Sequence, residues 1–186
     1  MHELKKTVAV FLDTEFSSLN EAERGLISLA LVAEPTDDAL YIVLANGWQK
    51  EAVSPFVRDT VLPLLTRYDP ELLTRAAAAA RIEEWLEARR PDPETSILLL
   101  SDSAIDVQEL ERLFEPGWAK QTAVTWRHVG TELENADSIS RFRDELDALF
   151  LRRGHAMRIR GGEQHHALVD ARMLKAAFRK VAGGAA

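Results

Sequence analysis

The first third of the chain alternates between apolar runs and short polar turns. Residues 7–16 form a nearly continuous apolar run that ends in two acids, which predicts a central strand covered on both faces. The β-rich runs 26–33 and 39–45 follow after turn-forming residues and predict a second and a third strand. Together they predict a β-meander at the start of the fold.

From residue 54 onward the apolar positions recur at helical spacing, interrupted by two short strand-like runs. Ser54 before Pro55 is typical of a helix start, and Pro63 should kink or end that helix. The predicted elements that follow are a helix from Asp69 to about Arg90, a strand at 97–100, a helix at 107–114, a strand at 122–129, a helix at 138–152, a basic loop at 152–162 and a last helix at about 166–181.

Length and composition fit one ordinary domain. The chain has 186 residues, of which 46% are hydrophobic. We expect a single domain over 1–181 and a flexible tail over 182–186. No apolar run is long enough to span a bilayer and no signal-peptide pattern opens the chain, so we expect a cytoplasmic protein that does not contact membranes. With no cysteine, a metal would have to be held by oxygen or imidazole.

The net charge of −7 argues against a protein that holds nucleic acid through a broad basic surface. It does not exclude a nuclease. Carboxylates clustered around divalent cations make such an enzyme acidic at the site itself, and the bound cations reverse the field that a phosphate meets.

The first candidate site is the pair Asp13 and Glu15 at the end of the first predicted strand. Side chains two residues apart on a strand point to the same face, so both carboxylates can reach one cation. Two other Asp-x-Glu triplets, at 69–71 and 92–94, are better explained as turns or helix starts. The alternative for Asp13 and Glu15 is a solvated strand end.

The second candidate segment is 101–106, directly after the strand at 97–100. Its acids, Asp102 and Asp106, lie at a strand end and in the first turn of a helix, where a carboxylate also caps free backbone N–H groups. Capping is the alternative to a functional role for both. Asp106 is the better candidate because Asp102 is better placed to close the turn.

The third candidate is the pair His165 and Asp170. Five residues of a straight helix would put them on different faces, so they converge only if His165 lies before the helix or in its first turn. Gly161 and Gly162 make that arrangement easy. The alternative for His165, and for its neighbour His166, is an exposed residue at a helix start.

Taken in order, these three segments resemble the DEDDh family of 3′→5′ exonucleases. The family has Asp-x-Glu on the first strand, an Asp after the fourth strand and His-x4-Asp on the last helix. The resemblance spans residues 8 to 178, and the segments 13–16, 26–34, 57–63 and 165–172 look like a bacterial exoribonuclease subfamily. It implies an α/β, ribonuclease-H-like fold: a mixed five-stranded sheet with an antiparallel second strand, flanked by helices.

The resemblance also implies roles for the candidate residues. Asp13, Glu15, Asp106 and Asp170 would hold two Mg²⁺ or Mn²⁺ ions, and His165 would take a proton from the attacking water. Many members carry an Asn and an aromatic residue before the third acid, where this chain has Asp102 and Ile105. Whether Asp102 contributes to the site is therefore left open.

Substrate contacts are less specific. Phe16 could stack on the terminal base or belong to the core. Arg158 and Arg160 precede the last helix, where they could contact phosphates or lie on a solvated surface. The four tryptophans are best explained as core or interface residues.

The function predicted from the sequence is a metal-dependent 3′→5′ exoribonuclease that acts on single-stranded or short RNA and releases 5′-mononucleotides. A DNA exonuclease of the same family is one alternative, since no motif reads the 2′-hydroxyl group. A catalytically silent nucleic-acid-binding domain is another. A homodimer is common among relatives, but no feature of this chain marks an interface.

Overall fold

A six-stranded mixed sheet forms the centre of the computed structural model, which describes residues 6–114, 116, 118, 122–133, 136–157 and 165–182, with 152–157 described by their backbone. Its strand order is β4-β3-β2-β1-β5-β6. The strands are β1 (Thr7–Phe16), β2 (Leu26–Ala33), β3 (Ala39–Leu44), β4 (Glu71–Leu73), β5 (Ser96–Ser101) and β6 (Val124–His128). β2 is antiparallel to both β1 and β3, whereas the β1–β5, β3–β4 and β5–β6 pairs are parallel.

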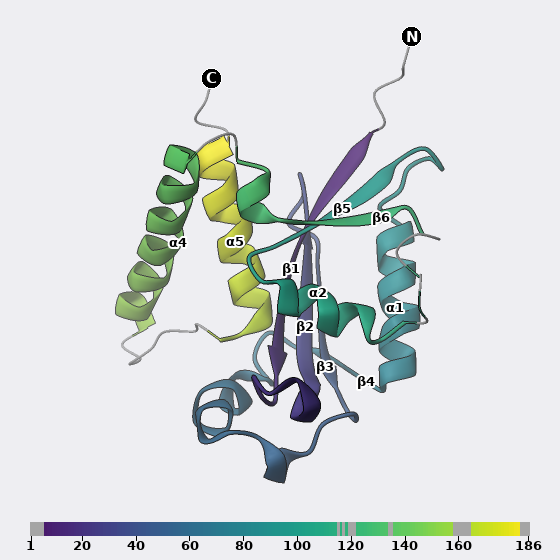
Figure 1. The fold of residues 1–186 in the computed structure, drawn as a ribbon, viewed down its shortest axis with the longest axis vertical. Coiled ribbons are helices and arrows are strands. Elements are labelled where there is room, and N and C mark those ends of the chain that lie inside the picture. The colour runs from purple at the N-terminus through teal and green to yellow at the C-terminus, as the bar shows by residue number, and fades with distance from the viewer. Residues whose placement is uncertain are drawn as a thin grey trace.

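Helices cover both faces of the sheet (Figure 1). They are α1 (Arg75–Glu87), α2 (Ala104–Glu111), α4 (Ala136–Met157) and α5 (Ala167–Ala182). Alternate residues of β1 serve the two faces. Val10 and Leu12 pack in the core with α1 and α2, whereas Phe11 packs in the core with α5. The predicted α/β architecture is thus confirmed, with a central first strand that is covered on both sides.

The sheet has six strands rather than the five predicted, because β4 forms where the sequence predicted the start of a helix. Tyr68 and Asp69 both have positive φ angles and turn the chain before Pro70. Because β4 lies at the edge of the sheet, the absence of an N–H group on Pro70, just before the strand, is tolerated. The helix begins later, at Thr74, whose side chain accepts a hydrogen bond from the N–H of Ala77.

The helix predicted after Ser54 is irregular. Ser54 does cap it, since its Oγ accepts a hydrogen bond from the N–H of Val57 at 3.2 Å. A π-helical turn at Val57–Val61 and a 3₁₀ turn at Leu62–Leu64 then follow. Pro63 explains the departure from regular α-helix because it has no N–H to donate one turn back.

Other boundaries differ from the prediction for local reasons. α2 begins at Ala104, before the predicted 107, because the Ser103 side chain caps it by accepting a hydrogen bond from the N–H of Ile105. α4 extends to Met157, so the first part of the predicted loop at 152–162 is helical. Arg, Ala and Met are good helix formers, and the one glycine in this stretch does not end the helix. No helix of the described ranges is long and apolar enough to cross a membrane.

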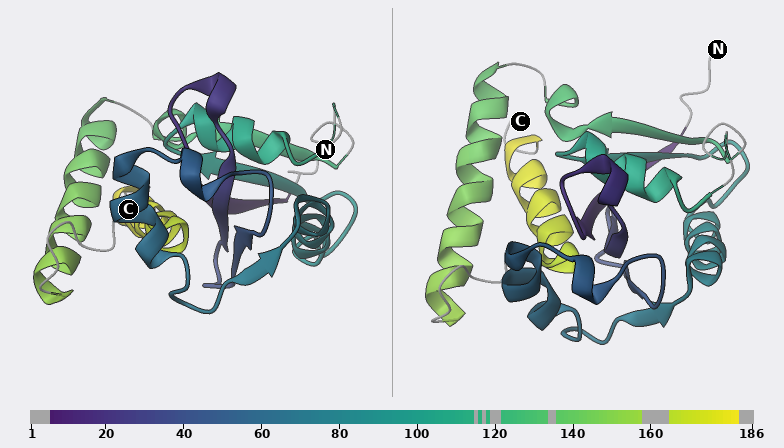
Figure 2. Two further views of the ribbon diagram at one scale, coloured as in Figure 1. Left: turned by 90° about the horizontal axis from the view of Figure 1, so that it is seen from below. Right: turned by 60° about the horizontal axis from the view of Figure 1, so that its bottom comes forward.

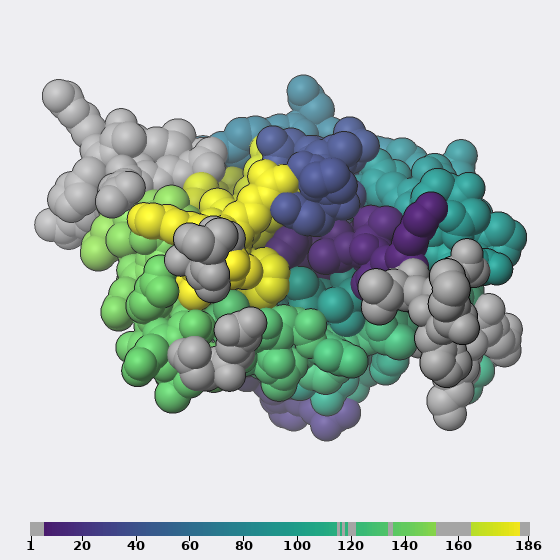
Figure 3. Space-filling model, turned by 90° about the horizontal axis from the view of Figure 1, so that it is seen from above, coloured from purple at the N-terminus to yellow at the C-terminus, as the bar shows by residue number. Residues whose placement is uncertain are grey.

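One buried cation joins α5 to the turn between β2 and β3. Lys175 is only 3% exposed, and its ammonium group donates to the carbonyl oxygens of Ala33 and Thr36 and to Asp37 Oδ1, with Glu34 Oε2 at 3.3 Å. Figure 3 shows this turn, in blue, lying against α5, in yellow. The contact fixes the rotation and height of α5 on the sheet.

Candidate active site

At the carboxyl end of β1, successive side chains face two different helices. Asp13 and Glu15 continue the alternation of Phe11 and point to the α5 face, whereas Thr14 points to the α2 face. Thr14 Oγ1 donates a hydrogen bond to Asp106 Oδ1 at 2.8 Å. The register with β2 shifts between Glu15 and Phe16, so regular pairing ends at the site.

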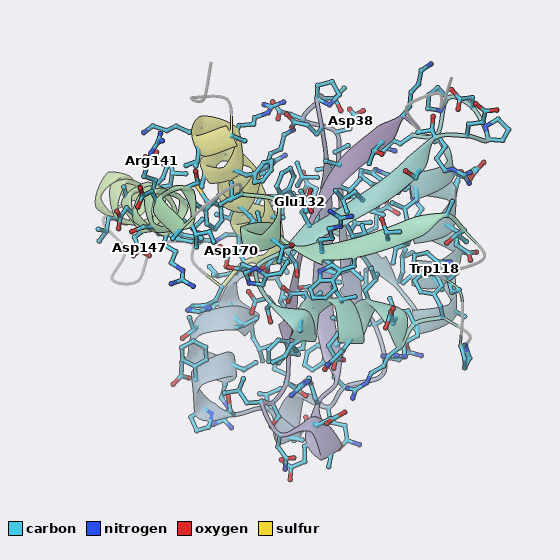
Figure 4. All side chains as sticks on the ribbon, turned by 45° about the horizontal axis from the view of Figure 1, so that its top comes forward. Asp38, Trp118, Glu132, Arg141, Asp147 and Asp170 are labelled. Carbon is cyan, nitrogen blue, oxygen red and sulfur yellow. The ribbon has the colours of Figure 1, made fainter. Side chains whose placement is uncertain are left out.

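The structure brings all five sequence-predicted acid–base residues to this end of β1. Glu15, His165 and Asp170 form one group whose ligand atoms lie within 4.8 Å of one another. A second group consists of Asp13, Asp102 and Asp106, again within 4.8 Å. Figure 4 labels Asp170 on α5, beside the end of the sheet.

Asp102 belongs to the second group and also lies in the turn between β5 and α2. The neighbouring serines close that turn. Ser101 Oγ donates to the carbonyl of Ser103 at 2.6 Å, and Ser103 caps α2. The hydrogen bonds between the serines therefore close this turn alongside Asp102.

His165 lies just before α5, as the spacing to Asp170 requires. It has a φ of 69°, a left-handed conformation, and its backbone N–H donates to Asp170 Oδ2 at 2.9 Å. The N–H groups of Val169 and Asp170 both donate to the carbonyl of His166, which starts the helix. The two functional candidates are thereby held together by the helix start itself.

Burial and mutual repulsion dominate the electrostatics of the carboxylates. Burial, followed by the charges of Asp106, Asp170 and Glu15, raises the pKa of Asp13 well above its usual range. Burial likewise raises the pKa of Glu15, and it raises the pKa values of Asp106 and Asp170 to about 7. No basic side chain of the described residues is hydrogen-bonded to any of these carboxylates.

Three carboxylate oxygens at the site have no hydrogen-bond partner among the described residues: Asp13 Oδ2, Asp106 Oδ2 and Asp170 Oδ1. Buried polar atoms are almost always paired, so each needs an explanation. Hard divalent cations such as Mg²⁺ and Mn²⁺ prefer carboxylate oxygens. The donor set therefore fits a site for such cations.

Next to the acids is a cavity of about 540 Å³. Asp13, Glu15, His165 and Asp170 line one part of it. Two apolar side chains line another part and face solvent, Leu19 at 78% exposure and Phe56 at 54%. Exposed apolar side chains beside polar groups are typical of a ligand pocket.

Nothing in the sequence marked Leu19 and Phe56 as site residues. Leu19 lies in a polar loop, and Phe56 is one of several apolar residues at helical spacing after Ser54. The edge of the Phe56 ring contacts the ring of His165, with centroids 4.9 Å apart. Burial lowers the pKa of His165, which favours the neutral imidazole.

A buried ion pair holds the loop that carries Leu19. Arg24 lies 3.7 Å from Glu109 of α2, and both side chains are buried. Arg24 also donates to the carbonyls of Ser18 and Leu19, and its guanidinium lies over the Phe16 ring at 5.3 Å. Viewed from the carboxyl end of β1, this loop and the Lys50–Leu64 segment both lie at the same end of the sheet (Figure 2).

His166, the neighbour of His165, is buried among aromatic rings. Its ring lies 4.7 Å from that of Tyr41 and 5.1 Å from that of Tyr68. The exposed helix-start interpretation of His166 is thus wrong, because β3 and the turn before β4 cover it. The packing anchors the backbone next to His165.

The three predicted substrate-contact residues fall into two groups. Phe16 lines the cavity, and the Arg24 guanidinium lies over its ring; its stacking on a base stays a prediction. Arg158 and Arg160 lie outside the described residues. Of the tryptophans, Trp85 and Trp118 are buried, whereas Trp126 on β6 is 36% exposed.

The chain has the same fold as solved structures of exonucleases, at low sequence identity. The nuclease domain of 3′hExo, a DEDDh family member bound to rAMP, superposes with a TM-score of 0.59 over 95% of this chain and 92% of that one, at 12% identity. A full-length 3′-exonuclease gives a TM-score of 0.62 over 95% of this chain and 82% of that one, at 14% identity.

The E. coli exonuclease I complex with single-stranded DNA, in its zinc-bound form, is also similar. Its TM-score is 0.56 at 17% identity, and the match covers 97% of this chain. This chain matches only 42% of that longer one. No protein-family model matches the chain, and neither does any curated protein.

Proposed function

We propose that this chain is a divalent-metal-dependent 3′–5′ exonuclease that hydrolyses the terminal phosphodiester bond of single-stranded or short RNA. The observation that carries the proposal is the convergence of like-charged carboxylates, with buried oxygens that have no partner among the described residues, at the cavity that His165 also lines. A fold gains no stability from such an arrangement, so a ligand of opposite charge is its physical explanation.

Asp13, Glu15, Asp106 and Asp170 are the residues that would hold two Mg²⁺ or Mn²⁺ ions. Their unpartnered oxygens are the donors available. When bound, the two ions stabilise the attacking and leaving oxygens of an in-line displacement at phosphorus. The protein's own contribution is to fix the four carboxylates from three elements, β1, α2 and α5.

His165 is the general base in this proposal. Burial lowers the pKa of His165, which favours the neutral imidazole, and its backbone N–H donates to Asp170 Oδ2. It can then accept a proton from the attacking water. Contact with the Phe56 ring restricts the orientation of the imidazole.

The apolar part of the cavity is suited to a terminal base. Leu19 and Phe56 offer apolar surface without base-specific hydrogen bonds, so they would accept any base. A volume of about 540 Å³ suits one nucleotide rather than a duplex. Phe16 forms another part of the same wall.

Direction and substrate class draw on the comparisons and the sequence motifs. 3′hExo was crystallised with rAMP, a ribonucleotide, which supports a site for ribonucleotides in this fold. The exonuclease I structure contains single-stranded DNA, and this favours DNA as the alternative substrate. The motif resemblance to bacterial exoribonucleases makes RNA the preferred proposal.

The test is degradation of a 5′-labelled short RNA by the purified protein with Mn²⁺, beside DNA of the same sequence. We expect a ladder that shortens from the 3′ end, and the ratio of RNA to DNA rates decides between the two substrates. Asp13→Ala should lower the rate at least about a thousandfold. Lack of product on both strands, despite metal binding, would instead support a silent nucleic-acid-binding domain.

A further inference from the structure

We propose that Asp102 is a metal ligand, and that Asp13, Asp102 and Asp106 form an all-carboxylate cation site distinct from the Glu15–His165–Asp170 group. The inference rests on the proposed function in that both require divalent cations. It adds a fifth carboxylate, from the β5–α2 turn, to the four that the motifs identify.

The geometry of the three acids fits one small cation. One oxygen from each of Asp13, Asp102 and Asp106 lies within 4.8 Å of the other two. Oxygens bound to one Mg²⁺ at about 2.1 Å lie roughly 3–4 Å apart. A small adjustment of side chains therefore brings all three into coordination.

An independent feature of Asp106 points to a ligand at this place. Asp106 is 3% exposed, and Thr14 occupies only its Oδ1. The other oxygen, Oδ2, has no hydrogen-bond partner among the described residues. A cation coordinated by all three carboxylates explains why this buried oxygen has no hydrogen-bond donor in the described part of the chain.

The backbone that carries Asp102 is held in place from β6. Gly130 donates its N–H to His128 Nδ1 at 3.0 Å, which leaves Nε2 as the donor nitrogen of the ring. His128 Nε2 then donates to the carbonyl of Asp102 at 3.0 Å. Trp126 Nε1 donates to Ser101 Oγ at 3.3 Å, which fixes the preceding residue.

The charge of Asp102 acts on the other acids of the site. One of its carboxylate oxygens lies within 4.8 Å of an oxygen of Asp13 and of Asp106. An amide at this position would keep an oxygen donor but remove the charge. The structure therefore predicts tighter cation binding for this chain than for the same chain with Asn at position 102.

The experiment is calorimetric titration of the full chain with Mn²⁺, without nucleic acid, for the wild type and Asp102→Asn. Asp59→Asn is the matched control, because Asp59 is an exposed acid on the cavity-lining π-helical turn and lies outside both ligand groups. Melting curves without metal check that each variant folds.

We expect two Mn²⁺ ions per wild-type chain. Asp102→Asn should lower the affinity for one ion at least about tenfold and change the affinity for the other by less than about twofold. Asp59→Asn should bind both ions as the wild type does. Equal binding by Asp102→Asn and the wild type would overturn the inference and leave the proposed function standing. An equal loss in Asp59→Asn would also overturn it, because the effect would be one of general charge.

The two proposals can fail separately. If the wild type binds two ions and Asp102→Asn loses one, but no strand is degraded, the cation site is supported and the exonuclease proposal fails. If the wild type binds no Mn²⁺, both proposals fail.

Discussion

Helix α5 carries two charged residues that are treated in opposite ways, Asp170 in its first turn and Lys175 further along. Lys175 is buried, and two carbonyls and two carboxylates surround its ammonium group. Asp170 faces other acids, and one of its oxygens has no partner among the described residues. The same helix thus contains one charge that the fold neutralises and one that it does not.

This difference distinguishes a charged residue that stabilises the fold from charged residues that form the candidate site. Lys175 joins α5 to the β2–β3 turn, and its contacts are complete without any further molecule. The carboxylate cluster needs cations to neutralise its charge, because burial and mutual repulsion both oppose the ionised carboxylates. The charge that has no counterion among the described residues, on Asp170 and its neighbours, therefore indicates the functional site. The neutralised charge, on Lys175, belongs to the scaffold.

The largest effect on stability should come from removing the neutralised charge. We expect Lys175→Met to lower the free energy of unfolding by about 2–4 kcal/mol, because it leaves two carbonyls and nearby carboxylates without their cation. Lys180→Met is the control, since Lys180 is 58% exposed and makes a surface ion pair with Glu145. It should change stability by less than about 1 kcal/mol. Equal effects in denaturant unfolding would show that Lys175 is not the structural link described.

A substitution of His166 tests how far the packing beside His165 determines the position of that residue. His166→Ala removes the ring between Tyr41 and Tyr68, and the backbone next to His165 should shift. If the chain is the proposed exonuclease, we expect kcat to fall about tenfold to a hundredfold with little change in KM.

Restoring the ring should restore the rate. His166→Phe keeps the aromatic contacts without the nitrogens, so it should recover most of kcat. A Phe variant as slow as the Ala variant would assign a chemical role to the imidazole instead.

The pH dependence of the metal-free protein should give a smaller effect. Folded pKa values of about 7 for Asp106 and Asp170 lie above the usual value of 3.8, so their stabilising effect is complete below pH 3.8 and disappears as pH rises through 7. Between pH 6 and 8 the metal-free protein should lose about 1–3 kcal/mol of unfolding free energy. Saturating Mn²⁺ should abolish this loss. A metal-free stability that rises from pH 6 to 8 would contradict the assignment.

The sequence predicted the strand and helix pattern well where the hydrophobic period was unambiguous, as in β1 and α5. It failed at β4, because Asp69-Pro70-Glu71 fits a helix start and an edge strand equally well. Pro63 predicted a kink or an end of the helix after Ser54, but not the π-helical turn that forms before it.

The acids and His165 could be predicted because their spacing is fixed by strand and helix geometry. Leu19 and Phe56 could not, because their places in the cavity depend on which segments meet in space; for Asp102 the sequence left a role in the site open. Leu19 is placed by Arg24, which pairs with Glu109 of α2 and donates to the Leu19 carbonyl. Such contacts join residues far apart in the chain and leave no local pattern.

The most direct test of the central claim is a melting experiment on the wild type and Asp106→Asn, each with and without Mn²⁺. The amide keeps an acceptor for Thr14 and removes one buried charge. Without metal, Asp106→Asn should therefore melt higher than the wild type. With Mn²⁺ the order should reverse, because only the wild type gains the full binding energy, about 2.7 kcal/mol at a hundredfold excess over Kd. A wild type that does not respond to Mn²⁺ and melts above Asp106→Asn in both conditions would contradict the account.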